Sequence, residues 1–261
     1  MASDVVGLVP TVVGVLGSRR RASVDGAGCI TAAGVGWQLD WWIGADDRWR
    51  VPAAETAVRQ SRVRDAPVVQ TALRVPGGDA VQRVYGAGGL ADVVVVEIEN
   101  ASPAPFVAAL VLRRAPGGRL RSVGVDGPTA TVDGHAVLVA SRPPGRWAAS
   151  TSSGTALDVV REGHASSGPF PGARDRAGAL EVALLYPVAH RTTARFAVPL
   201  APKDRSASAA PVDLAGLPDA DEAARGWEGQ LARGLRVDVP DPRLQSAIDA
   251  ARASLLLATP G

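Results

Sequence analysis

Apolar and polar residues alternate with a period of two through most of the first two hundred residues. In 36–43 one face is apolar throughout and consists of Trp37, Leu39, Trp41 and Ile43. This is the pattern of a half-buried strand. It predicts further strands over 68–75, 80–85, 93–99, 106–112, 129–132, 135–140, 180–186 and 193–200. No helical pattern separates these segments, so the sequence predicts a mainly β protein built as a large antiparallel β-sandwich.

Short turn motifs join several of the predicted strands. Pro76-Gly77-Gly78-Asp79 separates two of them, and Asp133-Gly134 separates another two. Asp-Gly is typical of a two-residue hairpin, because both turn positions need a positive φ. The apolar run at 5–16 is too short for a membrane span, and its basic residues follow it, in the reverse order of a secretory signal. We expect this run to form one or two opening strands.

The pattern changes after about residue 200, which divides the chain into three parts. Residues 1–200 are the predicted sandwich, and 201–218 are rich in Ala, Pro and Ser, as is typical of a linker. The remainder, 219–261, is helical in pattern. Asp219 and Glu222 have the spacing of a capping box at the start of the first helix. Gly234 suits the C-terminus of that helix.

A second helix is predicted to begin with Asp241 as its N-cap and Pro242 in its first turn. Its apolar positions have the spacing of a helix with one buried face and are Leu244, Ala247, Ile248, Ala251, Leu255 and Ala258. Such a face needs a partner surface, and the sequence leaves two alternatives, a helical catalytic domain or a second chain. Because prolines stiffen the entry to the helix, we expect it to be loosely held or self-associating.

Composition narrows the class of protein and its location. The chain of 261 residues is 46% hydrophobic and 21% charged with a net charge of +2, as is typical of a soluble globular protein. Arg19-Arg20-Arg21 is too short for a phosphate-binding surface, so no nucleic-acid partner is expected. Cys29 is the only cysteine, which excludes an intrachain disulfide and gives no sign of an oxidising compartment. We expect a cytoplasmic protein without a membrane partner.

The sequence lacks the motifs of several common enzyme chemistries. His135, His164 and His190 have no metal-ligand spacing to one another. No G-x-S-x-G nucleophile motif occurs, and the glycine groups at 26–28 and 86–89 do not complete a dinucleotide-binding motif. We therefore expect no metal, no cofactor and no catalytic residue in this chain.

Four of the six tryptophans fall within 37–49, where a strand runs into a charged turn. Tryptophan rings stack on sugar CH surfaces, and carboxylates and arginines bond hydroxyl groups. This pattern gives a tentative carbohydrate-binding set, made up of Trp42, Asp46, Asp47, Arg48 and Trp49.

Two further observations bear on this set. Trp42 shares a strand face with the polar residues Gln38 and Asp40, which favours a role other than core. The alternative is that the tryptophans are core and strand-edge residues, with 44–47 forming a turn and Arg48 pairing locally. Asp46 and Asp47 are a poor glycosidase pair, because neighbouring strand side chains point to opposite faces.

Several of these segments resemble one known family. They are WQLDWWIGADDRWRVP at 37–52, PVVQT at 67–71, VPGGDA at 75–80 and VEIENASP at 96–103. They are similar to the N-terminal β-module of bacterial six-hairpin glycosidases, such as glycogen-debranching amylo-α-1,6-glucosidases and glucoamylase-like enzymes. Residues 226–257 resemble the linker helix and first barrel helix of these proteins.

The resemblance implies a supersandwich-like module of a glycoside hydrolase that acts on α-glucans or related glycosides. In that family the catalytic carboxylates lie in an (α/α)6 barrel, C-terminal to the module, and no residue of this chain corresponds to them. We therefore expect a non-catalytic accessory β-sandwich domain that is inactive alone. The alternative is a stand-alone carbohydrate-binding module that uses the Trp-rich strand. A self-sufficient enzyme of another type has the least support.

Overall fold

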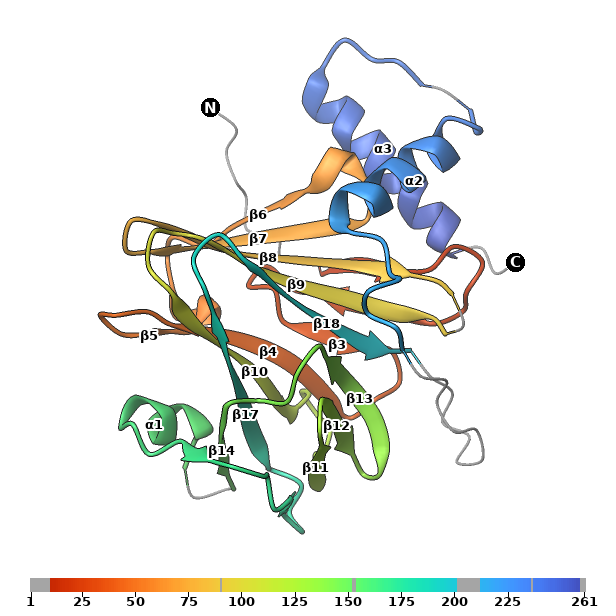
Figure 1. Cartoon of the computed structure of the whole chain (residues 1–261). Coiled ribbons are helices and arrows are strands. Elements are labelled where there is room, and N and C mark those ends of the chain that lie inside the picture. The colour runs from red at the N-terminus through yellow and green to blue at the C-terminus, as the bar shows by residue number, and fades with distance from the viewer. Residues whose placement is uncertain (1–9, 90, 152–153, 201–211, 236, 259–261) are drawn as a thin grey trace.

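Two nine-stranded antiparallel sheets pack face to face as a sandwich and are followed by short C-terminal helices in the computed structural model (Figure 1). The structure describes residues 10–89, 91–151, 154–200, 212–235 and 237–258. The predicted class, a mainly β antiparallel sandwich with a helical C-terminal part, is confirmed. The start of the predicted opening strands, 5–9, and most of the predicted linker, 201–211, lie outside the described residues.

Sheet 1 contains the Trp-rich strand near its centre. Its strands lie in the order β1 (Thr11–Gly14), β2 (Arg21–Val24), β3 (Ile30–Ala32), β4 (Trp37–Gly44), β10 (Phe106–Arg114), β17 (Glu181–Val188), β14 (Arg146–Ser150) and β15 (Ser166–Ser167). A short ninth strand, β5 (Trp49–Arg50), pairs with the end of β4.

Sheet 2 carries the longest hairpins. Its strands lie in the order β16 (Ala173–Arg174), β11 (Ser122–Asp126), β12 (Thr129–Val132), β13 (His135–Ala140), β18 (Thr193–Pro199), β9 (Val93–Ala101), β8 (Gly78–Ala87), β7 (Val68–Val75) and β6 (Arg59–Arg62). The predicted bounds of β7, β12 and β13 are confirmed residue for residue. Asp133 and Gly134 join β12 to β13 with φ of 50° and 81°, as the predicted hairpin turn requires.

The main core lies between the two sheets and is built from the inward residue of each alternating pair. The predicted apolar face of β4 belongs to it, since Trp41 and Ile43 are fully buried and Trp37 is 7% exposed. From sheet 2, Phe196 packs edge-on against Tyr186 of sheet 1 with ring centroids 4.8 Å apart. Alternation along the chain therefore identifies the inner faces correctly.

Both outer faces of the sandwich are also partly covered by helices, and the sequence predicted neither cover. Helix α1 (Ala156–Arg161) lies on sheet 1, while α2 (Ala220–Leu231) lies on sheet 2 (Figure 1). We expected helices only after about residue 218, so α1 is a correction. A six-residue helix is too short to give a clear period. Its sequence signal is the N-cap Thr155, whose side chain accepts from the Asp158 amide at 3.2 Å.

Two one-turn 3₁₀ helices, η1 (Pro52–Ala54) and η2 (Val63–Asp65), complete the elements that precede α3 (Pro242–Ala258). Helix α3 contacts α2, η2 and β1. Within the described residues, no helix has the length and apolar character needed to cross a membrane.

The predicted start of α2 is confirmed, whereas its end differs from prediction. The Asp219 carboxylate accepts from the Glu222 amide at 2.7 Å, and the Glu222 carboxylate accepts from the Asp219 amide at 3.0 Å. The helix ends at Leu231, before the predicted Gly234. The Leu231 carbonyl accepts from the Gly234 amide at 3.3 Å and from the Arg252 guanidinium on α3 at 2.6 Å, so a turn that ends at Gly234 and a side chain together cap the C-terminus.

The N-terminus of α3 is also confirmed, because Asp241 accepts from the Arg243 amide at 2.8 Å. The predicted apolar stripe is not buried within this chain, and the prediction that a partner covers it stays a prediction. Helix α3 packs through Ala253 and Leu257, which are 0% and 2% exposed. The predicted stripe faces outward, and its residue Leu244 is 52% exposed. Periodicity predicts a stripe, but it does not decide which side of the helix meets the rest of the protein.

Candidate functional site

The Trp-rich segment forms β4, a tight turn and β5. The Ala45 amide donates to the Arg48 carbonyl at 3.2 Å and closes the turn. Gly44 lies directly against the ring of Trp49, and a Cβ atom at this position would lie 2.7 Å from two ring carbons. Only glycine therefore allows the Trp49 ring to lie in its observed place beside β4.

Trp42 lies on the outer face of sheet 1, as its position in β4 predicts, but it is not accessible. The side chain is 2% exposed and belongs to an apolar cluster with Ala156 and Val160 of α1. The polar neighbours of Trp42 along β4 favoured a solvated face, and α1 covers that face. In this arrangement the indole has no free face on which a sugar ring would stack.

Asp47 and Arg48 are engaged in local ion pairs. Asp47 and Arg50 form a two-pronged pair, with O–N distances of 2.7 and 2.6 Å. The hydrogen bonds from Arg50 lower the pKa of Asp47 to about 2. Arg48 pairs with Glu55, with Nη2 and Oε2 2.9 Å apart, and this hydrogen bond lowers the pKa of Glu55. Both pairs fix the shape of the turn.

The remaining members of the predicted set are Asp46 and Trp49. Asp46 is exposed at the turn, and Trp49 is half-buried at the start of β5. The structure therefore brings an exposed carboxylate and part of an indole to one turn, without Trp42. A carboxylate accepts hydrogen bonds from hydroxyl groups, and an indole face packs on CH groups. Asp47 and Arg48 are exposed as well, but both are held in ion pairs, so Asp46 and Trp49 are the accessible members of the predicted set that lie outside those pairs.

A buried charged pair on the same outer face was not predicted. Asp40 is 1% exposed, and its Oδ2 lies 2.9 Å from Nη2 of Arg113 on β10. With its amide oxygen turned toward Arg113, Gln38 accepts from Nε at 2.8 Å. Burial raises the pKa of Asp40, while the Arg113 charge opposes that rise. A charged residue in the middle of an otherwise buried strand was the available sequence signal.

Arg113 of this pair lines a hollow of about 420 Å³ at the end of β10 and the start of β17. The polar residues of its lining are Gln38, Arg113, Arg114 and Glu181. Glu181 accepts a hydrogen bond from the Ala156 amide at 2.8 Å, so it also holds the start of α1. Burial raises the pKa of the neighbouring Cys29 thiol, which disfavours the thiolate form that a nucleophile needs.

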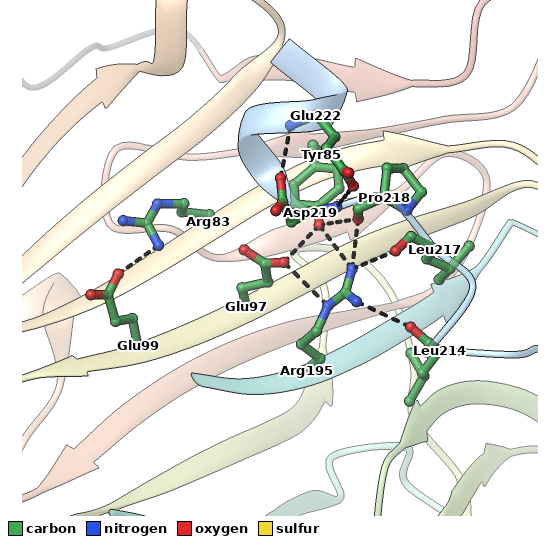
Figure 2. A network of polar contacts seen from close by, with 10 residues as sticks. All are labelled: Arg83, Tyr85, Glu97, Glu99, Arg195, Leu214, Leu217, Pro218, Asp219 and Glu222. Atoms are coloured by element: carbon green, nitrogen blue, oxygen red, sulfur yellow. Dashed lines mark hydrogen bonds and ion pairs between the residues drawn. The ribbon is translucent and has the colours of Figure 1, made fainter. Parts of the chain in front are cut away.

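A second polar network lies on the outer face of sheet 2, under the start of α2 (Figure 2). Glu97 is 5% exposed, and its Oε1 lies 2.8 Å from the Tyr85 hydroxyl and 3.2 Å from Nε of Arg195. Burial, followed by the Glu97 charge, raises the pKa of Tyr85. The three side chains come from β8, β9 and β18, which are neighbours in the sheet.

This network binds the described end of the predicted linker to the sandwich. The Arg195 guanidinium donates to three backbone carbonyls of this segment, those of Leu214, Leu217 and Pro218, at distances of 3.1, 3.2 and 2.6 Å. Residues 212–218 are thus fixed on sheet 2 before α2 begins, as Figure 2 shows. The network anchors one part of the chain to another, since its donors and acceptors bond to each other and to the backbone of 212–218.

A hollow of about 450 Å³ lies where η2, α2 and α3 meet. Arg64 and Asp65 at its rim have positive φ of 53° and 56°, an uncommon conformation for residues other than glycine. Asp65 accepts from the Ser246 hydroxyl at 2.6 Å, and Arg64 lies 3.5 Å from Glu228. These contacts attach η2 to both C-terminal helices, which accounts for the strained backbone.

Neither comparison with known proteins adds an identity to this geometry. The chain matches no protein-family model. It also matches no curated protein. Among the described residues, no group of three or more His, Cys, Asp and Glu side chains is arranged to hold a metal ion.

Proposed function

We propose that this chain is a non-catalytic accessory β-sandwich domain of a carbohydrate-active enzyme, a glycoside hydrolase that acts on α-glucans or related glycosides. Catalysis then belongs to a helical domain that works with this module. The proposal rests on the family resemblance of the Trp-rich strand and neighbouring segments. A cytoplasmic location is part of the proposal.

The observation that carries the proposal is the way the helical part is attached. Arg195 and its network hold 212–218 on sheet 2, α2 packs on the same face through Trp227, and α3 packs against α2. A large antiparallel sandwich followed by a fixed linker and two helices is the order of parts that the resemblance implies for such a module. The helices are held at a defined place, as an adaptor between two domains requires.

The charged groups of the Trp-rich turn also favour a structural role. Asp47 is paired with Arg50, and Arg48 is paired with Glu55. An inverting or retaining glycosidase needs two carboxyl groups about 5 to 10 Å apart that face one sugar, with one of them protonated. The lowered pKa of Asp47 makes it unsuited to the role of the acid.

The alternative function, a stand-alone carbohydrate-binding module, is favoured by one observation. Asp46 and the accessible part of Trp49 lie together at the turn between β4 and β5. An isolated indole with one carboxylate is a small contact surface, so the affinity expected from it is low.

Retention on immobilised amylose or glycogen separates these two functions. We expect the accessory domain to pass through a column of the immobilised glucan without measurable retention. A stand-alone binding module is retained, and the replacement Trp49→Ala abolishes its retention, whereas Trp49→Phe preserves a flat ring and part of the binding. Retention with this pattern would contradict the accessory function and support the alternative.

A further inference from the structure

The outward side of α3 has the character expected of a buried face. Between 244 and 258 its exposed residues carry no charge, and they are Leu244, Ala247, Ala251, Ser254, Leu255 and Ala258. Leu244 is 52% exposed and Leu255 is 67% exposed. A solvated helix face normally carries charged and polar residues. We name this surface, together with the half-buried Ile248, the outer stripe.

The charged residues of this part of α3 lie on the inner side. Arg252 bonds Asp249 at 2.9 Å and also caps α2. Gln245 donates to Asp249 at 2.9 Å. The polarity of the helix is therefore reversed relative to an ordinary surface helix, with polar contacts inward and an apolar stripe outward. A second apolar surface that covers the outer stripe resolves this reversal.

The spacing of the outer stripe is compatible with a helix as its partner. Leu244, Ala251 and Ala258 are separated by seven residues, and the other members fall between them at steps of three and four. This is the heptad spacing of a seam between two helices, in which each side chain fits between residues of the facing helix.

The order of large and small residues along the outer stripe makes it complementary to itself. In an antiparallel pair centred on Ala251, each large residue of one helix faces a small residue of the other, giving the pairs Leu244 with Ala258, Ala247 with Leu255, and Ile248 with Ser254. The two Ala251 residues meet on the two-fold axis. Small residues opposite large ones allow two helices to approach to about 8 to 10 Å.

We propose that the outer stripe of α3 is a homodimer interface, in which two copies of this chain pair their α3 helices antiparallel about Ala251. A two-fold interface of this kind uses the same surface on both copies, as most homodimers do. The seam is about 21 Å long at 1.5 Å per residue. We expect so short a seam to bury less than about 1,200 Å², the lower end of the range for standard interfaces, and the dimer to be weak.

The first test measures self-association by sedimentation equilibrium over about 5 to 200 μM of the full chain. We expect a reversible dimer. Leu244→Glu weakens it by about tenfold or more, because it puts two charges into the seam. The first turn of a helix tolerates an acidic residue, so this variant keeps α3 folded. Leu235→Glu is the matched control, since Leu235 is 81% exposed outside the helix, and it leaves the dimer unchanged.

The second test fixes the geometry by disulfide cross-linking. Ala251→Cys is expected to form a covalent dimer on mild oxidation, because the two copies of this position meet on the axis. Ala247→Cys is the matched control, since its two copies lie about eight residues or 12 Å apart, beyond disulfide reach. The natural Cys29 is 5% exposed and does not compete.

Two results would overturn the proposal. A chain that remains monomeric at about 200 μM shows that the outer stripe does not pair with itself and points to a foreign helical domain as its occupant. Equal cross-linking of Ala247→Cys and Ala251→Cys shows a parallel pair. The proposal does not depend on glucan chemistry, so its failure leaves the proposed function untouched.

Discussion

Replacing Arg195 with alanine is expected to lower the free energy of unfolding by about 3 kcal/mol or more. The change leaves Glu97 buried without its cationic partner, which is the costly way to break a buried pair. It also removes the donor for three backbone carbonyls of 212–218. Urea denaturation measures the loss, and hydrogen exchange of 212–258 measures the release of the linker and helices from sheet 2.

Two variants make this result specific. Arg83→Ala, on the same face of sheet 2, removes a pair with Glu99 in which both side chains are a quarter to a third exposed. It is expected to cost about 1 kcal/mol or less. Arg195→Lys keeps the positive charge but lacks the planar guanidinium, so its loss in the free energy of unfolding is expected to lie between those of the two alanine variants. If Arg195→Ala behaves like Arg83→Ala, the network does not hold the linker.

Replacing Trp42 with alanine is expected to lower the free energy of unfolding by about 3 to 5 kcal/mol, the range for removing a buried aromatic side chain. The large loss follows from its 2% exposure beneath α1. Trp49→Ala is the comparison and is expected to cost about 1 to 2 kcal/mol, because Trp49 is half-buried. Thermal and urea unfolding of both variants check the order of the two effects.

A small loss for Trp42→Ala, together with a change in glucan retention, would contradict the structural role assigned to this residue. It would show that α1 moves away from sheet 1 and uncovers the indole. The original interpretation of Trp42 as a binding residue would then be restored.

The strands were predictable because, in a half-buried strand, the polarity of each side chain indicates whether it faces the core or the solvent. Trp37, Leu39, Trp41 and Ile43 repeat every second residue, and they all lie in the core between the sheets. The hairpin at Asp133-Gly134 was predictable for a related reason, since its backbone geometry is a local property of two residues.

Contacts between distant segments were not predictable in this way. Nothing in 36–43 indicates that a helix at 156–161 covers Trp42, because that contact depends on how the chain returns across sheet 1. Helix α3 presents the same limitation. Its stronger apolar stripe faces outward. Its other side is held by the buried Ala253 and Leu257 and by Arg252, which caps α2.

The ion pairs of the candidate site show a third limit. Asp47 and Arg48 looked available in the sequence, and each has a partner within seven residues, Arg50 and Glu55 respectively. A charged turn presents the same residue types whether its charges bind a ligand or one another. The geometry of the turn decides between these outcomes, and it favours the internal pairs.

Glucose release from maltose, isomaltose, trehalose and glycogen tests the proposed function most directly. The substrates are offered to this chain alone and together with a helical domain encoded in frame with it or beside it, identified by helical hairpins that carry paired Glu or Asp. The account predicts no release by the chain alone and release when both parts are present. Release by the chain alone that Asp46→Asn or Asp47→Asn abolishes would contradict it.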